Sequence, residues 1–466
     1  MEGSSRRLQE EHMDVRNKRV IVCGMARSGI AAAKLLLSLG AVVTISDLKK
    51  EEDFGGALDE LRGESCIFAL GEGPQAYIAG QDVMVISPGI PLAKDFVQQA
   101  IAQGVEVIGE LELGARLMKG AMCAITGTNG KTTTTTLVGE LIRAAGYTTH
   151  VVGNIGYPIT AAAGVSTDAD MTVAEVSSYQ CETISQFHPH VGAVLNITED
   201  HLARHGTMQV YMEMKRRIFS CQTEEDFAVF NYDDADCRAM AEGLKAKVLW
   251  FSRTQQVPAG AYVRDGMIVL NLGDGDAEIC RADEVFIPGP HNLENALAAV
   301  TIAGAMGIPA SGMAQVLKTF AGVEHRIETV RTKDGVTWIN DSKGTNVDST
   351  LKAIDTMTRP TVLILGGSDK KTNFDPLAQR IVESPYIVSC VLIGDTAEQL
   401  KGSLDRAGFA AYRMTGYDFD ACLSACAELA QQGGNVLLSP ACASFDMFKD
   451  YEDRGRIFKE KVMALK

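Results

Sequence analysis

A short loop made of Gly127, Thr128, Asn129, Gly130, Lys131 and Thr132 has the residue types that bind phosphate groups. It follows the apolar run 122–126, which we expect to be a buried strand, and it leads into a threonine-rich segment that we expect to be a helix. Backbone N–H groups at a helix N-terminus bind phosphate, and glycine lets the phosphate approach closely. Lys131 can reach the outer phosphates of a nucleotide, and the Thr132 hydroxyl can hold Mg²⁺. The loop therefore predicts ATP binding, and the alternative is a glycine turn with a surface lysine.

The loop is shorter than the usual phosphate-loop motif, which would have glycine at position 125, where this chain has Ile125. Its chemistry alone does not say what the ATP is used for. A regulatory nucleotide hydrolase and a biosynthetic enzyme would both carry such a loop.

Length and composition limit the possible classes of protein. A chain of 466 residues is too long for one core, so two to four domains are expected. The net charge of −15, with no offsetting stripe of Lys and Arg, argues against nucleic-acid binding. Eleven scattered cysteines suggest free thiols in a reducing cytoplasm. The polar segment 1–18 lacks an apolar signal core, and no long apolar run occurs elsewhere, so we expect a soluble, cytoplasmic protein.

The first domain begins with a βαβ pattern. The strand 19–23 leads into a glycine turn, a helix follows, and a second strand ends at Asp47. This pattern is typical of dinucleotide-binding folds, but Ala26 replaces the middle glycine of the fingerprint. Another nucleotide-like ligand is therefore favoured over NAD, and a purely structural turn is the third possibility. A further strand, 82–86, ends at Ser87, Pro88 and Gly89, where such sheets bind ligands.

In the second domain, polar residues follow two predicted strands. Glu175 ends the strand 171–174, and the segment 196–201 ends the next one with His201. Glu175 is placed like a Mg²⁺ ligand, with a surface carboxylate as the alternative. Further along, Asn292 could be a helix N-cap, and Asn295 is the better candidate for contact with a ligand.

The third domain is expected to begin near Val323 and to be a second open α/β sheet. At this boundary Arg326 could close on ATP phosphates or form an interdomain salt bridge. Thr345, Lys370 and the segment 439–444 all follow predicted strands, which suits a small anionic substrate, although each signal is weak alone.

Taken together, these motifs resemble the Mur ligase family of ATP-dependent amide-bond-forming enzymes. The resemblance covers nearly the whole chain after Met13. It includes the phosphate loop, Gly-Asn-Ile-Gly at 153–156, Glu-Val-Ser-Ser-Tyr-Gln at 175–180, Asn-Ile-Thr-Glu-Asp-His at 196–201 and His-Arg at 325–326. The segments 341–346 and 438–446, with the N-terminal turn 24–29, resemble the D-glutamate-adding members in particular.

The resemblance implies an α/β fold with three domains: a Rossmann-like UDP-binding domain in 1–109, a central ATP-binding domain of the P-loop type with a mostly parallel sheet in 110–322, and a Rossmann-like amino-acid-binding domain in 323–466. It implies ATP-dependent addition of D-glutamate to UDP-N-acetylmuramoyl-L-alanine through an acyl phosphate, in peptidoglycan precursor synthesis. The implied partners are these small molecules, with no nucleic acid or membrane, and the protein is expected to be a monomer. The implied cofactors are two Mg²⁺ ions and a carbamate formed from CO₂ on a lysine.

The resemblance also assigns residues to roles. ATP would contact Gly127, Thr128, Asn129, Gly130, Lys131, Thr132, Thr133, Asn295, Arg326 and Asp341. Metal ions would be held by Thr132, Glu175, His201 and carbamylated Lys215, which its sequence context alone would place on a helix surface. The UDP substrate would meet Ala26, Arg27, Ser28, Asp47, Ser87, Pro88, Gly89, Asn154 and Ser177. D-Glutamate would meet Thr345, Lys370, Ser444, Phe445 and Tyr451. The catalytic residues would be Lys131, His201, Lys215 and Lys343.

One departure concerns Ala203, where relatives typically have Asp, and its loss could weaken metal affinity if that Asp supports the metal site. Three rival functions remain at this point. They are a P-loop switch, a related ligase that adds glutamate to folate or another amino acid to the same precursor, and a dehydrogenase built on the first domain. Ala26 and the ATP loop argue against the last of these.

Overall fold

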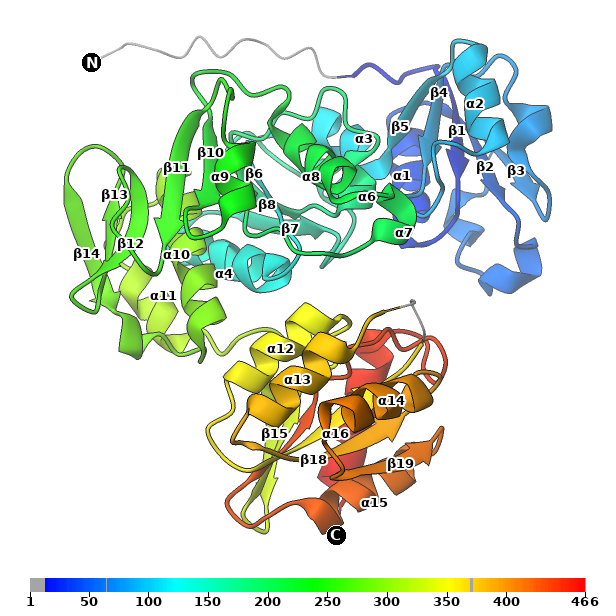
Figure 1. The fold of residues 1–466 in the computed structure, drawn as a ribbon. Helices are drawn as coiled ribbons and strands as arrows, with labels where there is room; N and C mark the ends of the chain where they lie inside the picture. Colours follow the sequence, from blue (N-terminus) through cyan, green and yellow to red (C-terminus); the bar gives the residue numbers. More distant parts are fainter. Residues whose placement is uncertain (1–12, 64, 369–371, 466) are drawn as a thin grey trace. The chain divides into compact units, whose positions relative to one another are not determined.

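The computed structural model describes residues 13–63, 65–368 and 372–465. Its strands form three sheets, each built from one stretch of the chain (Figure 1). By their internal contacts the residues form two compact units. One comprises Met1–Glu284 with Glu294–Lys318, and the other comprises Val285–Leu293 with Thr319–Lys466.

The first sheet is fully parallel, with the strand order β3-β2-β1-β4-β5. Its strands are β1 (Arg19–Cys23), β2 (Val42–Asp47), β3 (Cys66–Leu70), β4 (Val83–Ile86) and β5 (Glu106–Gly109), and its main helices are α1 (Arg27–Ser38) and α2 (Asp95–Ala102). The order reverses direction at β1, so the turn after β1 lies at the switch point where open α/β sheets bind ligands. The predicted βαβ start is confirmed.

The second sheet has nine strands in the order β14-β13-β12-β11-β10-β9-β6-β8-β7. The strands are β6 (Ala121–Thr126), β7 (Thr149–Gly153), β8 (Met171–Glu175), β9 (Val191–Val194), β10 (Phe227–Asn231), β11 (Lys247–Ser252), β12 (Gly260–Arg264), β13 (Met267–Asn271) and β14 (Asp276–Arg281). Only the last two pairings, β12 with β13 and β13 with β14, are antiparallel. The hairpin turn predicted at Asp265 joins β12 to β13.

Helices of this region connect the parallel strands, as the alternating pattern predicted. They are α4 (Lys131–Ala144), α5 (Ile159–Ala163), α6 (Ser178–Cys181), α7 (Leu202–His205), α8 (Met208–Arg216) and α9 (Ala235–Met240). Two further helices, α10 (Pro290–Ala305) and α11 (Met313–Thr319), follow β14. The carboxyl ends of β6, β8 and β9, which are neighbours in the sheet, therefore carry the phosphate loop, Glu175 and the segment 196–201 to one edge.

Helix α3 (Glu110–Leu117) follows β5 directly and joins the first sheet to the second. Its Glu112 is fully buried, pairs with Arg116 at 2.7 Å, and accepts hydrogen bonds from the backbone N–H groups of Ser185 and Gln186. Glu110 accepts from both the backbone N–H and the hydroxyl of Thr160. Buried carboxylates need such partners, so these bonds fix α3 to the central sheet.

The third sheet has the order β15-β16-β20-β17-β18-β19. Its strands are β15 (Glu328–Lys333), β16 (Val336–Asn340), β17 (Thr361–Gly366), β18 (Ile387–Ile393), β19 (Tyr412–Gly416) and β20 (Asn435–Leu438). The sheet is parallel except for the β15–β16 pairing. Helices α12 (Val347–Asp355), α13 (Asp375–Glu383) and α14 (Ala397–Ala407) cover one face, while α15 (Phe419–Leu429) and α16 (Tyr451–Ala464) cover the other (Figure 1).

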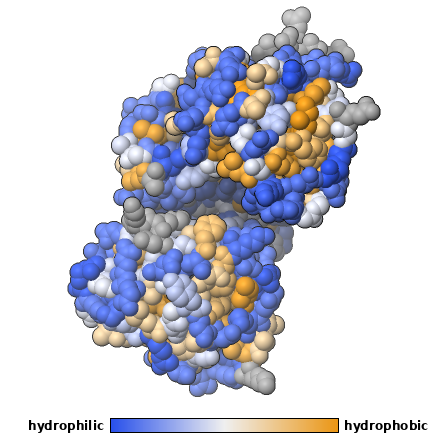
Figure 2. Space-filling view, turned by 90° about the vertical axis from the view of Figure 1, so that its right-hand side faces the viewer, coloured by the Kyte–Doolittle hydropathy of each residue, from blue (hydrophilic) through white to orange (hydrophobic). Residues whose placement is uncertain are grey.

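The cysteines are all free thiols, as expected, and Cys422 and Cys426 are buried packing residues of α15. None of the described helices is both long and apolar enough to cross a membrane. Figure 2 shows a face on which hydrophilic residues cover most of the surface and apolar residues lie between them.

Candidate functional site

The phosphate loop has the predicted strand–loop–helix structure. Strand β6 ends at Thr126, and α4 begins at Lys131 with Gly130 as its N-cap. Gly127 and Gly130 have φ values of 147° and 81°, which residues other than glycine rarely adopt. A Cβ atom on Gly130 would also lie 2.3 Å from Oδ1 of Asn295, so the loop needs glycine here both for conformation and for space.

Two side chains stabilise the phosphate loop through hydrogen bonds to its backbone. The Lys131 ammonium donates to the carbonyl oxygens of Gly127 and Thr128, at 3.0 and 2.8 Å, so its side chain folds back over the loop. Asn196, from the end of β9, accepts from the N–H of Asn129 at 2.8 Å and donates back to its carbonyl oxygen. This reciprocal pair gives Asn196 a positioning function that the sequence did not assign to it.

Glu175 lies at the end of β8, beside the loop, and is 1% exposed. One carboxylate oxygen accepts from the Thr132 hydroxyl and the other from the Asn154 amide, both at 2.8 Å. The alternative of a surface carboxylate is therefore wrong. A buried carboxylate beside a threonine hydroxyl at a phosphate loop is an oxygen donor set that fits Mg²⁺.

Lys215 lies near the end of α8 and is 1% exposed, so the interpretation as a helix-surface charge is wrong. Its Nζ donates to the Gly127 carbonyl at 2.8 Å and lies 4.5 Å from the centre of the Tyr211 ring. Burial, together with the nearby Lys131 ammonium, lowers the pKa of Lys215 from 10.5 to about 7. The amine is therefore substantially neutral at physiological pH, which is the form that reacts with CO₂.

His201 lies just before α7 with a left-handed backbone, φ 55°. Its Nδ1 is 3.1 Å from the Tyr179 hydroxyl, and its Nε2 is 3.5 Å from Asp200. Close by, Arg204 forms two bonds to Glu182, at 2.9 and 2.7 Å, and packs over the Tyr179 ring. The segment 196–201 therefore ends in a polar cluster. Arg204, which is paired with Glu182, packs against Tyr179 of this cluster.

Asn295 approaches the phosphate loop from α10, and its Oδ1 accepts from the Thr134 hydroxyl at 3.3 Å. The structure therefore places Asn295 beside the phosphate loop, and its contact with a ligand stays a prediction. The interpretation of Asn292 as an N-cap is wrong, because α10 already begins at Pro290, and the Asn292 amide donates to the Pro288 carbonyl.

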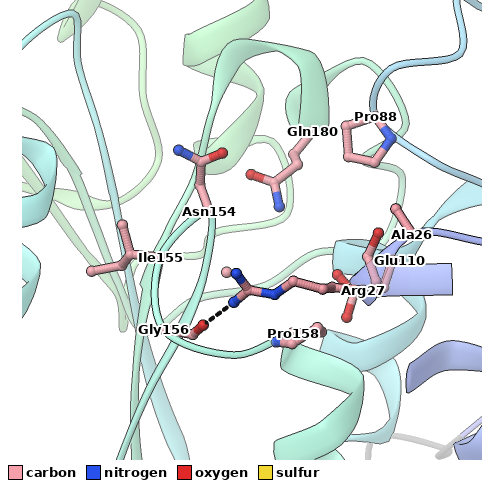
Figure 3. A pocket seen from close by; sticks show the side chains of 11 residues that line it. Ala26, Arg27, Pro88, Glu110, Asn154, Ile155, Gly156, Pro158 and Gln180 are labelled. Atoms are coloured by element: carbon pink, nitrogen blue, oxygen red, sulfur yellow. Dashed lines mark hydrogen bonds between the residues drawn. The ribbon is translucent and has the colours of Figure 1, made fainter. Parts of the chain in front are cut away.

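A pocket of about 290 Å³ lies between the turn after β1 and the segment after β7 (Figure 3). The lining residues include Ala26, Arg27, Ser28, Pro88, Glu110, Asn154, Gly156 and Gln180. Arg27 extends across the pocket and donates to the Gly156 carbonyl at 2.6 Å. Five of the residues expected at a UDP substrate are thus brought together, and Glu110 and Gln180 were not foreseen.

Two other residues of this predicted group have local structural bonds. Asp47 accepts from the N–H of Met25 at 2.7 Å and so holds the glycine turn after β1. Ser177 is the N-cap of α6, in a reciprocal arrangement with Gln180. Ser87 and Gly89 form the turn after β4, in which the N–H of Ile90 donates to the Ser87 carbonyl.

In the third domain the ends of β16 and β20 lie side by side. Asp341 is fully buried and accepts from the Ser439 hydroxyl at 2.7 Å, while Arg326 Nη1 lies 3.4 Å from its other oxygen. Burial raises the pKa of Asp341, and Arg326 opposes that shift. Arg326 thus pairs with a residue of its own domain.

Of the residues expected to meet D-glutamate, those that the structure describes follow the ends of β16 and β20 in the chain. Lys343 donates to the Tyr451 hydroxyl at 3.3 Å, and the N–H of Thr345 donates to the Lys343 carbonyl. The Ser444 hydroxyl is buried without a hydrogen-bond partner among the described residues, and Phe445 is 74% exposed. Lys370 lies outside the described residues. An unpaired buried hydroxyl beside an exposed ring fits a place for a polar ligand.

Sequence reasoning missed Arg454, which is fully buried on α16. Its guanidinium donates to the hydroxyl and carbonyl oxygens of Ser342 and to the carbonyl oxygen of Cys442. It therefore ties the loop after β16 to the loop after β20. No motif signals this, because an arginine inside a polar helix pattern is normally exposed.

The fold defines a three-domain α/β protein whose central domain carries a loop of the P-loop type. The Mur ligase MurD-like N-terminal domain matches residues 18–109, the Mur ligase middle domain matches 125–303, and the Mur ligase glutamate ligase domain matches 325–442. The chain belongs to the Mur ligase family.

Individual relatives agree with this. The chain is 43% identical to a UDP-N-acetylmuramoylalanine--D-glutamate ligase of Caldanaerobacter subterraneus subsp. tengcongensis, over 97% of this chain and 100% of the relative. It is 44% identical to the protein of the same name from Clostridioides difficile, with the same coverage. Among solved structures, UDP-N-acetylmuramate-alanine ligase from Thermotoga maritima has a TM-score of 0.61 at 17% identity, covering 96% of this chain and 100% of that one. The structural likeness supports the fold.

Proposed function

We propose that this protein is an ATP-dependent ligase that joins D-glutamate to UDP-N-acetylmuramoyl-L-alanine through an amide bond, in peptidoglycan precursor synthesis. The observation that carries the proposal is the full-length similarity, at 43% identity, to a relative named for this reaction. The phosphate loop with its buried acid and lysine supports it independently, because it provides a place for ATP.

The chemistry begins with activation of a carboxylate. A carboxylate does not react with an amine at neutral pH, because oxide would have to leave. In the proposed reaction the terminal carboxylate oxygen of the UDP substrate attacks the γ-phosphorus of ATP, the bond to ADP breaks, and an acyl phosphate forms. Lys131, whose ammonium lies in the loop, would balance the charge that develops on the phosphate oxygens.

Amide bond formation follows. The D-glutamate amine attacks the acyl carbon and loses a proton, and the tetrahedral intermediate expels phosphate. We assign D-glutamate to the third domain, where Ser444 offers an unpaired buried hydroxyl and Lys343 offers an ammonium. Arg326 and Asp341 are assigned to the nucleotide, and the pocket at Arg27 and Asn154 to the UDP substrate.

The proposal includes two Mg²⁺ ions, which would supply charge neutralisation for the phosphates when bound. Thr132 and Glu175 would hold one ion, and His201 the other together with a carbamate on Lys215. The buried, substantially neutral Lys215 fits carbamylation, because only a neutral amine adds CO₂. We further propose that the protein acts in the cytoplasm as a monomer.

Phosphate release from ATP tests the proposal. The assay contains UDP-N-acetylmuramoyl-L-alanine and compares D-glutamate with L-glutamate, L-lysine and meso-diaminopimelate. We expect release that depends on D-glutamate and an amide product of matching mass. Release that ignores the amino acid would support a nucleotide switch instead, and release with a different amino acid would support a different ligase of the family. Lys131→Ala is the matched inactive control.

A further inference from the structure

The turn 324–328, which leads into β15, holds Arg326 between two left-handed residues. His325 has φ 65° and Ile327 has φ 47°. Neither is glycine, and a β-branched residue such as Ile327 is particularly disfavoured there. Such a backbone conformation is strained and persists only where its surroundings hold it in place. Contacts with the surrounding residues must therefore stabilise the left-handed conformation of this turn.

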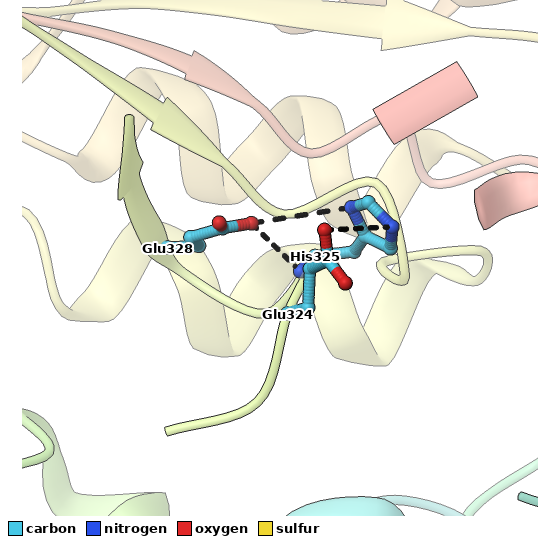
Figure 4. A group of neighbouring side chains, drawn as sticks. All are labelled: Glu324, His325 and Glu328. Carbon is cyan, nitrogen blue, oxygen red and sulfur yellow. Dashed lines mark hydrogen bonds and ion pairs between the residues drawn. The ribbon is translucent and has the colours of Figure 1, made fainter. Parts of the chain in front are cut away.

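Contacts within the domain hold the turn from one side. The backbone N–H of His325 donates to Glu328 Oε2 at 2.9 Å (Figure 4). The Asn340 amide lies 2.9 Å from His325 Nδ1 and 3.1 Å from Glu328 Oε2. The N–H of Ile327 is 3.3 Å from Asp341 Oδ1. Strands β15 and β16 thus supply bonds on both sides of Arg326.

Helix α16 holds the turn from the other side through two residues one helical turn apart, Gly455 and Lys459. A Cβ atom on Gly455 would lie 2.3 Å from His325 Nδ1 and 2.8 Å from its Cε1, so only glycine lets the imidazole pack here. The Lys459 ammonium binds Glu324 at 2.8 Å and Glu328 at 2.5 Å. Residues four apart share one helix face, which explains why both reach the same turn.

Glu324, His325 and Glu328 have the residue types of a metal site, and their possible ligand atoms lie close together (Figure 4). The Lys459 ammonium, however, binds both carboxylates. A divalent cation would have to displace it and leave its charge nearby. The cluster is therefore better explained as an ion-paired support for the turn than as a metal centre.

The turn connects the ion pairs of Lys459 to two candidate functional residues, Arg326 and Lys343. The His325 carbonyl accepts from the N–H of Lys343 at 3.1 Å. Arg326 lies between the two left-handed residues and reaches Asp341. A shift of the turn would therefore move the Arg326 side chain and the Lys343 backbone together.

We propose that Gly455 and Lys459 are positioning residues that hold the turn 324–328 in its left-handed form and so place Arg326, and with it Lys343, for ATP. This rests on the proposed function, in which Arg326 contacts the nucleotide. Neither α16 residue touches a reacting atom in this scheme. Their effect passes through the turn, so they should alter ATP kinetics without altering the site of the UDP substrate.

The first test is Gly455→Ala in the full-length protein, with Gly402→Ala as the matched control. Gly402 also lies inside a helix, α14, but a Cβ atom there would meet only the flexible Arg406 side chain, at 3.4 Å. We expect kcat/KM for ATP to fall at least about tenfold in Gly455→Ala, with the KM of UDP-N-acetylmuramoyl-L-alanine within about twofold of the wild type. The control should match the wild type. A Gly455→Ala protein with normal ATP kinetics would overturn the proposal.

The second test keeps the proposal falsifiable if Gly455→Ala fails to fold. Lys459→Met removes the ammonium, and Lys461→Met is its control, because Lys461 lies on the same helix and pairs with Asp420 at 2.6 Å. We expect only Lys459→Met to lower kcat/KM for ATP. If Lys459→Met only lowered the unfolding temperature, with unchanged ATP kinetics, its role would be merely structural and the proposal wrong.

A double-mutant cycle with Arg326→Ala separates the positioning role of the α16 residues from the role of Arg326 itself. If the α16 residues act through Arg326, adding Lys459→Met to Arg326→Ala should change ATP kinetics little further. Fully additive effects would contradict positioning through Arg326. If Arg326→Ala itself had no effect on ATP kinetics, the assignment of Arg326 in the proposed function would fail. Normal Lys459→Met kinetics beside an impaired Arg326→Ala would refute the positioning role alone.

Discussion

The buried amine of Lys215 leads to a quantitative prediction about its reaction with CO₂. A lysine with its ordinary pKa of 10.5 is neutral in roughly 0.03% of molecules at pH 7, whereas a pKa of about 7 makes about half of them neutral. The gain is roughly a thousandfold in the reactive form. Its cause is burial, helped by the Lys131 ammonium.

The lowered pKa of Lys215 determines how the rate of carbamate formation changes with pH. Below the pKa the neutral fraction rises about tenfold per pH unit, and above it the fraction levels off. At constant dissolved CO₂, the initial rate of carbamate formation on Lys215 should therefore rise up to about pH 7 and then change little. An ordinary lysine would keep rising tenfold per unit to about pH 10.

The assay follows the carbamate signal by ¹³C NMR after addition of ¹³CO₂, at pH values between about 6 and 9. Lys215→Arg supplies the background from all other amines and is subtracted. Thermal unfolding of both proteins at each pH checks that the fold is intact. A rate that still rises steeply between about pH 8 and 9 would refute the reasoning, because it would show an amine of ordinary pKa.

Three further results are expected. Lys131→Ala should lower ADP formation by about 10²-fold or more, measured at saturating substrates with circular dichroism unchanged, because a loop donor to the phosphates is lost. Glu112→Ala should lower the unfolding temperature by several degrees, because it leaves the buried Arg116 without its nearest partner, while Glu60→Ala, at an exposed pair with Lys34, should leave it nearly unchanged. Asp47→Ala should raise the KM of the UDP substrate but not of ATP, because it frees the turn after β1.

Much of the fold was predictable because parallel strands appear in the sequence as apolar runs that end in glycine or polar residues. The phosphate loop after β6 and Glu175 at the end of β8 follow this rule, and neighbouring parallel strands bring their carboxyl ends to one edge. The candidate ATP site was therefore recoverable from local pattern. Its glycines matched positions where the backbone is left-handed or closely packed.

Residues that act through burial were not predictable in the same way. Lys215 follows a polar helix pattern, and only the packing of α8 against the phosphate loop buries it. Arg454 and Glu112 are similar, since each is a charged residue on a helix whose burial depends on a segment distant in sequence. Local periodicity contains no information on such tertiary contacts.

The joint at α3 has a consequence for substrate length. Glu110 and Glu112 fix the first sheet to the central sheet by buried hydrogen bonds, so the distance from the turn after β1 to the phosphate loop is set before any ligand arrives. If the UDP substrate spans the two, as proposed, this separation limits the length of the substrate. In the proposed reaction, we therefore expect a precursor that is one amino-acid residue longer or shorter to be a poorer substrate, because its carboxylate would be misplaced at the phosphate loop.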